Sequence, residues 1–152
     1  MKKVALTICA LMILGAVCVP AAFAQGAVKQ GPNAALTRDP DLEKDSLHNL
    51  EVARHYFKTK KAYRAAIARC EEIIAGHPNF SRIDEVLYIA GSSSLRLADN
   101  RGKQTAKTPS DKLREDAREY LSRIVKEYPD SSFREQAQSD LRALDGATAK
   151  KQ

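Results

Sequence analysis

Three histidines are the side chains in this 152-residue chain that most invite a metal-binding interpretation. His48 and His55 are seven residues apart, so on a helix they would share a face but lie two turns from each other. That separation is too large for both to hold one ion unless a third element supplies a ligand between them. His77 precedes a proline in a turn. Because the residue spacings of zinc sites are absent, we predict no metal site and no cofactor.

Serine and cysteine are the other candidates, since a nucleophilic catalyst needs one of them together with a base and an orienting acid. Ser92-Ser93-Ser94 follows Gly91 without such neighbours, and small residues there favour close helix packing. A lone cysteine in an oxidising compartment could be reactive. Cys70 falls on an apolar stripe, however, so we favour burial for it. Without a catalytic constellation we predict that the protein is not an enzyme.

The first 24 residues have the features of a secretory signal peptide. Lys2 and Lys3 supply the positive start, Val4–Val19 is uncharged and mostly apolar, and Ala22-Phe23-Ala24 places small residues where a signal peptidase reads. The alternative is a retained anchor, although the run is short of the roughly 20 apolar residues that a span needs. We therefore expect cleavage before Gln25 and a periplasmic or secreted mature protein.

Two cysteines in this leader raise the question of a lipid anchor. Bacterial lipobox sequences place a small residue directly before the modified cysteine. Cys18 follows Val17, and Cys9 follows Ile8. By this criterion we predict that the protein is not a lipoprotein.

The charge of the chain is mildly basic. It is +6 overall, and removal of the leader leaves 23 basic and 19 acidic residues, a net charge near +4. A dispersed excess of this size favours an acidic partner or an anionic surface. No basic stretch carries interleaved stacking aromatics, so we predict no nucleic-acid partner and only indirect contact with a membrane.

The elements that must position any site are helices. Residues 25–44 contain several glycines and prolines and read as a flexible linker, whereas residues 145–152 read as a disordered tail. Between them, residues 45–144 have apolar side chains at helical spacing in five successive stripes. The stripes are Leu47, Leu50, Ala53 and Phe57; Tyr63, Ala66, Ile67, Cys70, Ile73 and Ile74; Ile83, Val86, Leu87, Ala90, Leu95 and Leu97; Leu113, Ala117, Leu121, Ile124 and Val125; and Phe133, Ala137, Leu141 and Leu144.

Turn and start signals separate these stripes. Pro78 and Pro129 end the second and fourth, and Asp99–Ser110 reads as an exposed loop. Capping boxes are expected at Ser81, Thr108 and Ser132, each with an acidic residue three positions later. No segment has the alternation typical of a strand. We predict an all-α fold.

An internal repeat is the strongest signal in the sequence. The segment that begins at Ala66 and ends at Pro78 recurs from Ala117 to Pro129, with an offset of 51 residues. In both segments the alanine stands twelve residues before the proline. A small residue allows two antiparallel helices to cross closely, and stacking of one hairpin on the next covers apolar faces that neither could bury alone.

The repeated residues resemble a tetratricopeptide (TPR) unit. The run Ala53-x-x-Tyr56-Phe57-x5-Tyr63-x-x-Ala66-Ile67-x11-Asn79 carries this resemblance, and it is most similar to the units of BamD-type outer-membrane assembly proteins and their periplasmic relatives. The resemblance implies two helix pairs followed by a capping helix. It also implies a concave groove, lined by the first helix of each pair, that binds a peptide or a partner helix.

By this resemblance the groove would be lined by His48, Glu51, His55 and Lys58 from the first unit and by Tyr88, Ser92 and Arg96 from the second. Tyrosine and arginine commonly anchor interfaces. We predict a non-catalytic adaptor or scaffold in the bacterial cell envelope, with a link to outer-membrane assembly implied by the resemblance. Stacked arrays usually need three or more units, so self-association or a protein partner is expected to complete the stack.

The alternative is an electrostatic binder of cell-wall polymer or of an anionic lipid surface. Lys103, Lys107 and Lys112, together with the Lys150-Lys151 tail, would supply the charge. Binding that weakens steeply as the salt concentration rises would distinguish this mode from binding in the groove.

Overall fold

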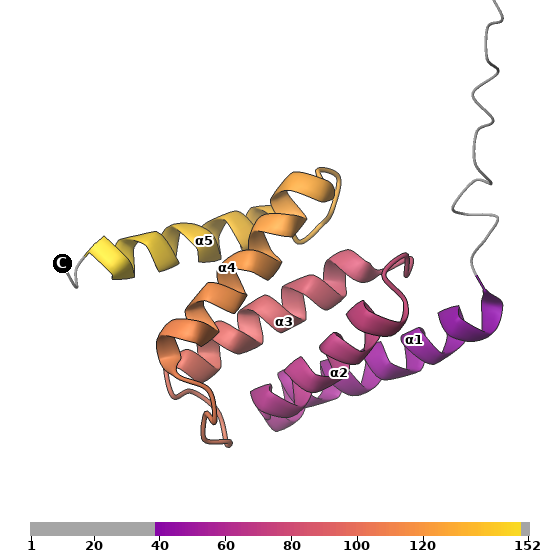
Figure 1. The fold of residues 1–152 in the computed structure, drawn as a ribbon, viewed down its shortest axis with the longest axis horizontal. Helices are drawn as coiled ribbons and strands as arrows, with labels where there is room; N and C mark the ends of the chain where they lie inside the picture. The colour runs from indigo at the N-terminus through magenta and orange to yellow at the C-terminus, as the bar shows by residue number, and fades with distance from the viewer. Residues whose placement is uncertain (1–38, 150–152) are drawn as a thin grey trace, which may run out of the picture. The chain divides into compact units, whose positions relative to one another are not determined.

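The computed structural model describes residues 39–149, and within this range the chain is helical without a strand. The elements in order are α1 (Pro40–Arg54), the short π-helix η1 (His55–Lys60), α2 (Tyr63–Gly76), α3 (Ile83–Ala98), α4 (Ser110–Glu127) and α5 (Arg134–Ala149). Figure 1 shows them as a succession of helical hairpins. The predicted all-α, TPR-like array of two helix pairs and a capping helix is confirmed. The leader, the cleavage site and Lys150-Lys151 lie outside the described residues.

The first hairpin consists of α1, η1 and α2. Leu50, Ala53 and Phe57 are buried against α2, as their spacing predicts, whereas Leu47 remains 38% exposed. The hairpin turns at Lys61, which adopts a left-handed conformation with φ of 51°. The Ala62 N–H then donates to the Tyr56 carbonyl at 2.9 Å. This backbone hydrogen bond closes the last turn of the π-helix η1.

Helix α1 begins earlier than the sequence predicts. The domain was expected from residue 45, but α1 starts at Pro40, so Pro40–Lys44 is helix and not linker. The Asp39 side chain accepts the Asp41 N–H at 2.9 Å, and proline fits the first position of a helix because its missing N–H has no intrahelical partner there. An Asx cap followed by proline is a start signal that apolar periodicity alone does not show.

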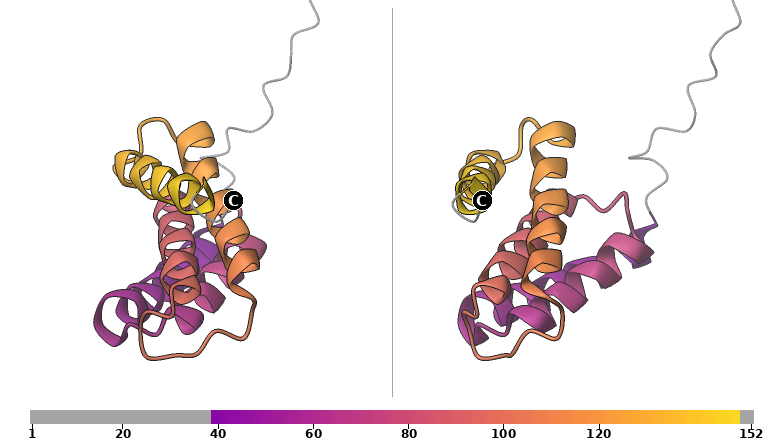
Figure 2. Two further views of the ribbon diagram at one scale, coloured as in Figure 1. Left: turned by 90° about the vertical axis from the view of Figure 1, so that its left-hand side faces the viewer. Right: turned by 60° about the vertical axis from the view of Figure 1, so that its left-hand side comes forward.

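Helix α3 occupies the centre of the described fold. It contacts α2 on one side and α4 on the other, and α5 packs along α4, as the views in Figure 2 show. Thirteen of its sixteen residues are buried. Val86, Ile89 and Ala90 face the core shared with α1 and α2, whereas Leu87 and Tyr88 face the core shared with α4 and α5.

The crossing of α3 and α4 is close because small residues meet there. A Cβ added at Gly91 would lie 2.8 Å from Leu121 Cγ and 3.4 Å from the Ala117 carbonyl oxygen. Ala117 is fully buried, as the repeat predicts for the position where two helices cross. Gly91 therefore sets how near the two helices can approach.

Residues 99–109 form a loop, which ends one residue before the predicted limit at Ser110, and the loop folds back on the start of α2. The Lys103 N–H donates to the Lys61 carbonyl at 3.1 Å, and the Gln104 side chain accepts the Ala65 N–H at 3.2 Å. Gly102 has φ of +98°, and a Cβ there would lie 2.5 Å from the Lys61 oxygen. Glycine is required at this point because only it permits both the conformation and the close approach.

Other boundaries differ from the sequence prediction. Helix α5 continues to Ala149, so residues 145–149 are helical and not disordered. The N-cap positions also differ from those expected, since Arg82 precedes α3 and Pro109 precedes α4, one residue after Ser81 and Thr108. At the start of α5, Ser131 and not Ser132 accepts a backbone N–H, from Phe133 at 3.1 Å.

None of the helices within residues 39–149 combines the length and the apolar character that crossing a bilayer requires.

Replacement of Gly91 by valine should force α3 and α4 apart. Overpacking of a filled core commonly destabilises by 1–3 kcal/mol, and we expect Gly91→Val to lower the free energy of unfolding by about 2 kcal/mol. Gly76→Val is the matched control, because nothing lies within 4 Å of a Cβ at that exposed position. Its effect should stay within about 0.5 kcal/mol. Urea unfolding of both variants measures the difference, and equal losses would contradict the close crossing.

Candidate partner-binding surface

The seven residues predicted to line a groove fall into two groups. His48, Glu51, His55 and Lys58 all lie exposed on α1 and η1. On α3, by contrast, Tyr88 and Ser92 are buried and Arg96 is half-buried. The structure therefore does not bring the seven together as one open surface.

Tyr88 and Ser92 are covered by α5 and its preceding turn. The Tyr88 ring stacks on the Phe133 ring, with centroids 5.0 Å apart and planes inclined by 20°. Ser92 Oγ donates a hydrogen bond to Asp140 Oδ2 at 3.1 Å. Both side chains are thus buried, because the capping helix covers the face of α3 that the resemblance assigns to the groove. The sequence showed that α5 exists but not which face it covers.

Arg96 also uses its side chain within the fold. Its guanidinium carbon lies 4.4 Å from the centroid of the Phe57 ring and 5.6 Å from that of Tyr63. A cation over aromatic faces is attracted by the negative charge of the ring faces, and partial burial strengthens this attraction. Arg96 thus holds the end of α3 against the first hairpin, and its remaining exposed edge borders η1.

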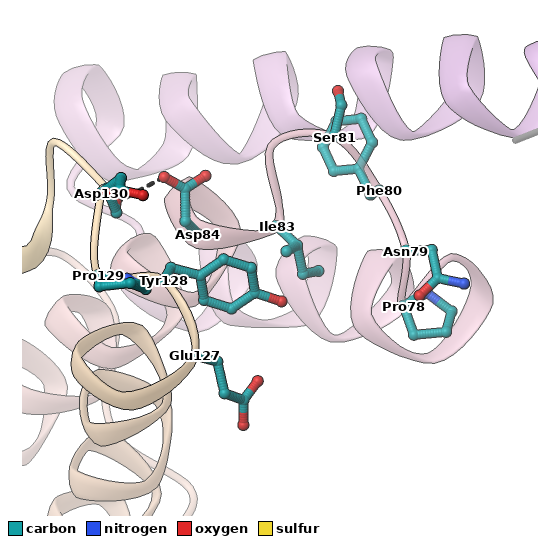
Figure 3. Close-up of a pocket in the computed structure, with 11 residues that line it drawn as sticks. Pro78, Asn79, Phe80, Ser81, Ile83, Asp84, Glu127, Tyr128, Pro129 and Asp130 are labelled. Carbon is teal, nitrogen blue, oxygen red and sulfur yellow. Dashed lines mark hydrogen bonds between the residues drawn. The ribbon is translucent and has the colours of Figure 1, made fainter. Parts of the chain in front are cut away.

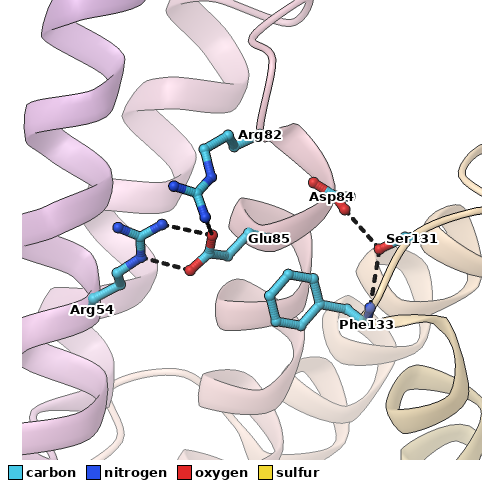
Figure 4. Close-up of polar contacts among 6 residues, drawn as sticks. All are labelled: Arg54, Arg82, Asp84, Glu85, Ser131 and Phe133. Carbon is cyan, nitrogen blue, oxygen red and sulfur yellow. Dashed lines mark hydrogen bonds and ion pairs between the residues drawn. The ribbon is translucent and has the colours of Figure 1, made fainter.

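A buried carboxylate joins α3 to α1. Glu85 accepts hydrogen bonds from Arg54 Nε and Nη2 at 2.6 and 2.7 Å, and Arg82 Nη2 lies 2.8 Å from its second oxygen. Figure 4 shows both guanidinium groups directed at this one carboxylate. Burial alone would raise the pKa of Glu85, but the hydrogen bond and charge of Arg54, with a further contribution from Arg82, hold it below its usual range.

The adjacent carboxylate joins α3 to the α4–α5 turn. Ser131 Oγ donates to Asp84 Oδ2 at 2.6 Å and accepts the Phe133 N–H at 3.1 Å (Figure 4). Asp84 and Glu85 therefore tie the start of α3 to elements on opposite sides of it. These contacts fix the position of Phe133, whose ring covers Tyr88.

A cleft lies between the two inter-repeat turns. It has a volume of about 460 Å³. It is lined by residues 78–81 of the α2–α3 turn with Ile83 and Asp84 of α3, and by Glu127 of α4 with residues 128–131 of the α4–α5 turn. Figure 3 shows the Tyr128 ring lying between the turns. Burial, and secondarily the charge of Glu127, raises the pKa of Tyr128. Sequence analysis did not identify this cleft, although the 51-residue offset relates Pro78 to Pro129 and could have placed the two turns side by side.

The remaining polar clusters hold elements together. Ser46 Oγ lies 3.1 Å from His77 Nδ1, and Glu43 Oε2 lies 3.9 Å from His77 Nε2, which secures α1 to the α2–α3 turn. Ser46 is buried, so a substrate has no access to its hydroxyl. Cys70 is buried, as predicted, and burial raises the pKa of its thiol. Among residues 39–149 no three histidine, cysteine or acidic side chains gather in a way that could hold a metal ion.

Comparison with known proteins yields one family. The family model described as "YfiO: Outer membrane lipoprotein" matches residues 33–152, which is most of the chain and all of its described helices. No curated protein and no solved structure matches the chain.

Glu85→Gln should lower the free energy of unfolding at neutral pH. It should also remove the loss of stability in acid that comes from protonation of Glu85. A carboxyl whose pKa is lowered by folding contributes stability above its unfolded pKa, near 4.3, and that contribution is lost as the pH falls through the folded pKa. We expect a loss of about 2 kcal/mol at pH 7, because Arg54 keeps some access to water. The difference from the unsubstituted protein should shrink as the pH falls from about 5 to about 3.

Glu72→Gln serves as the control for this measurement. Glu72 pairs with Arg69 at 2.7 Å, but both side chains are exposed, so its removal should cost less than about 1 kcal/mol. Urea unfolding across the pH range compares the two variants. A loss for Glu85→Gln that equals the control, or that does not change with pH, would show that the carboxylate does not join α3 to α1 in solution.

Proposed function

The chain belongs to the family of outer membrane lipoproteins described as YfiO, and from this premise we propose that it is a non-catalytic protein-interaction adaptor of the bacterial cell envelope that acts in outer-membrane assembly. Its helical hairpins provide a rigid support for exposed side chains, which is the way repeat proteins of this kind bind partners. A peptide or helix of another envelope protein is the partner that such a surface fits.

The surface we assign to this partner is the exposed face of α1 and η1, formed by Leu47, His48, Glu51, His55 and Lys58, and called the α1 face below. Leu47 and His48 are adjacent, and Glu51, His55 and Lys58 follow at intervals of three or four positions, so they form one stripe along the helix. The observation that supports the assignment is that all of them are exposed, including the apolar Leu47.

The opposite flank of the array supports the same choice. Because Tyr88 and Ser92 already contact Phe133 and Asp140, a partner would have to displace α5 before it could reach them. Substitution of Tyr88 would therefore disturb the docking of α5 and not a partner contact. A partner could reach the α1 face without such a rearrangement. Arg54 and Arg96, at the border of this face, are already held by contacts within the fold, so fewer side chains have to be ordered on binding.

A triple variant, Leu47→Asp, His55→Glu and Lys58→Glu, should reduce capture of the envelope partner by about tenfold or more. The change removes the apolar side chain and makes the nearly neutral stripe strongly acidic, at positions that are exposed. The measurement is quantitative mass spectrometry of proteins retained from envelope extracts by the purified variant.

The control for this variant changes the net charge by the same amount elsewhere. Ala68→Asp, Ala75→Glu and Lys126→Glu lie on exposed positions of α2 and α4, away from the α1 face. The control should retain the partner at the level of the unsubstituted protein. Equal retention of the partner by both variants would contradict binding at the α1 face. If a second copy of this chain is the one protein that the triple variant fails to retain, the interaction is self-association.

The form in which the protein is exported can be tested separately. The family is named for lipoproteins, whereas Val17 and Ile8 precede the two leader cysteines, Cys18 and Cys9. From this sequence context we expect a mature chain that begins at Gln25 without lipid. Intact-mass measurement of the protein from the envelope fraction decides the point, because a chain that begins at Cys18 with an added acyl mass would refute it.

A further inference from the structure

Two segments far apart in the sequence meet at the end of the array where α1 turns into α2 and α3 leads to α4 (Figure 1). The Lys103 N–H donates to the Lys61 carbonyl, and Arg64 Nη1 donates to the Thr105 carbonyl at 3.3 Å. The loop backbone thus lies directly against the turn before α2. The requirement for glycine at position 102 fixes this approach.

Both segments are rich in cations and free of acids. Residues 55–70 and residues 100–110 contain no aspartate or glutamate. These segments hold seven exposed cations, of which Lys58 belongs to the α1 face and Arg64 donates to the Thr105 carbonyl. We call the other five the basic end: Lys60, Lys61, Arg101, Lys103 and Lys107. Within the described part of the chain none of the five takes part in an ion pair.

The structure distinguishes these cations from others in the same region. Lys112, which the sequence offered as part of an anionic-surface site, is paired with Glu115 at 3.2 Å and Asp116 at 3.0 Å. Arg114 is paired with Asp99 at 2.7 Å, which neutralises the one acid at the start of the loop. In this region the cations without an ion pair to a described residue therefore lie in the two joined segments.

The composition of the basic end favours a lipid surface over a protein partner. Four of the five cations are lysines, which act as compact point charges, whereas bidentate recognition of single carboxylates favours arginine. Protein interfaces also need apolar or aromatic anchors. The large apolar side chains that remain exposed among the described residues, Leu42 and Leu47, both lie on α1 and not at this end.

We propose that the basic end binds the phosphate headgroups of an anionic lipid bilayer and so orients the protein on a membrane surface. Clusters of four to eight lysines and arginines bind such surfaces through summed electrostatic attraction. The choice of a bilayer rests on the envelope location in the proposed function, but the site is separate from the α1 face. Because no large apolar side chain is exposed at the basic end among residues 39–149, this end would contact the headgroups through charge alone.

The test uses vesicles of phosphatidylethanolamine with phosphatidylglycerol, and neutral phosphatidylcholine vesicles for comparison. The protein, purified in its exported form, should bind the anionic vesicles and lose that binding as salt is raised from 50 to 300 mM, because screening shortens the reach of the charges. Lys60→Gln, Lys61→Asn and Lys103→Gln together should weaken binding by about 100-fold. Asparagine is used at position 61 because it tolerates the left-handed backbone there.

A control variant with the same change in net charge shows whether position matters. Lys44→Gln, Lys126→Gln and Arg134→Gln remove three exposed cations from the start of α1, the end of α4 and the start of α5. This variant should keep vesicle binding within about threefold of the original, since screening limits the contribution of distant charges. Circular dichroism and urea unfolding confirm that both triple variants are folded.

Three results would overturn the proposal: equal weakening by the two triple variants, equal binding to neutral vesicles, or binding to soluble polyphosphate without binding to anionic vesicles. Equal weakening would show that the net charge of the protein, and not the position of these cations, attracts it to the vesicles. Binding to polyphosphate alone would show that the basic end takes a free phosphate ligand. Retention of the envelope partner by the Lys60, Lys61 and Lys103 variant is expected. Failure here therefore leaves the α1 face and the adaptor function untouched.

Discussion

The burial of α3 on nearly every side is the constraint on which the rest of the structure depends. A helix with thirteen of sixteen residues buried needs partners for its carboxylates and sterically compatible packing at each crossing. Glu85 therefore needs Arg54 and Arg82, and Asp84 needs Ser131. The same demand explains the glycine at position 91, where any side chain would enter the space of Leu121. These contacts connect α3 with α1, with α4 and with the start of α5. The position of α3 therefore determines where its neighbours pack.

This arrangement also decides which surfaces remain for partners. The contacts of Tyr88 with Phe133 and of Ser92 with Asp140 use the α3 face within the fold. Exposed residues of mixed character are left on α1, and cations without an ion pair to any residue of the described part of the chain are left where the α1–α2 turn meets the α3–α4 loop. A protein with one face for a polypeptide and one end for an anionic surface would be suited to hold a partner close to a membrane.

Much of the fold could be predicted from sequence because it follows from local signals. Apolar spacing located the helices, and the recurrence of Ala66 and Pro78 as Ala117 and Pro129 revealed the hairpin repeat. The helix starts were less predictable, since the cap at Asp39 depends on a single hydrogen bond. For the candidate site, the sequence could predict the exposure of the α1 side chains but not the burial of those on α3. Whether Tyr88 faces solvent or Phe133 depends on where α5 packs, and residues 45 positions apart in sequence give no local sign of that contact.

The central claim is that a partner binds along α1 while the corresponding face of α3 is closed by α5. Photo-cross-linking in living cells tests it most directly, with a photoreactive amino acid placed in turn at His48 and His55 on α1 and at Ser92 on α3. The account predicts adducts with another envelope protein from the two α1 positions, and from position 92 only cross-links within the chain. Adducts with a partner from position 92, and none from α1, would contradict it and would show that α5 moves aside to admit the partner.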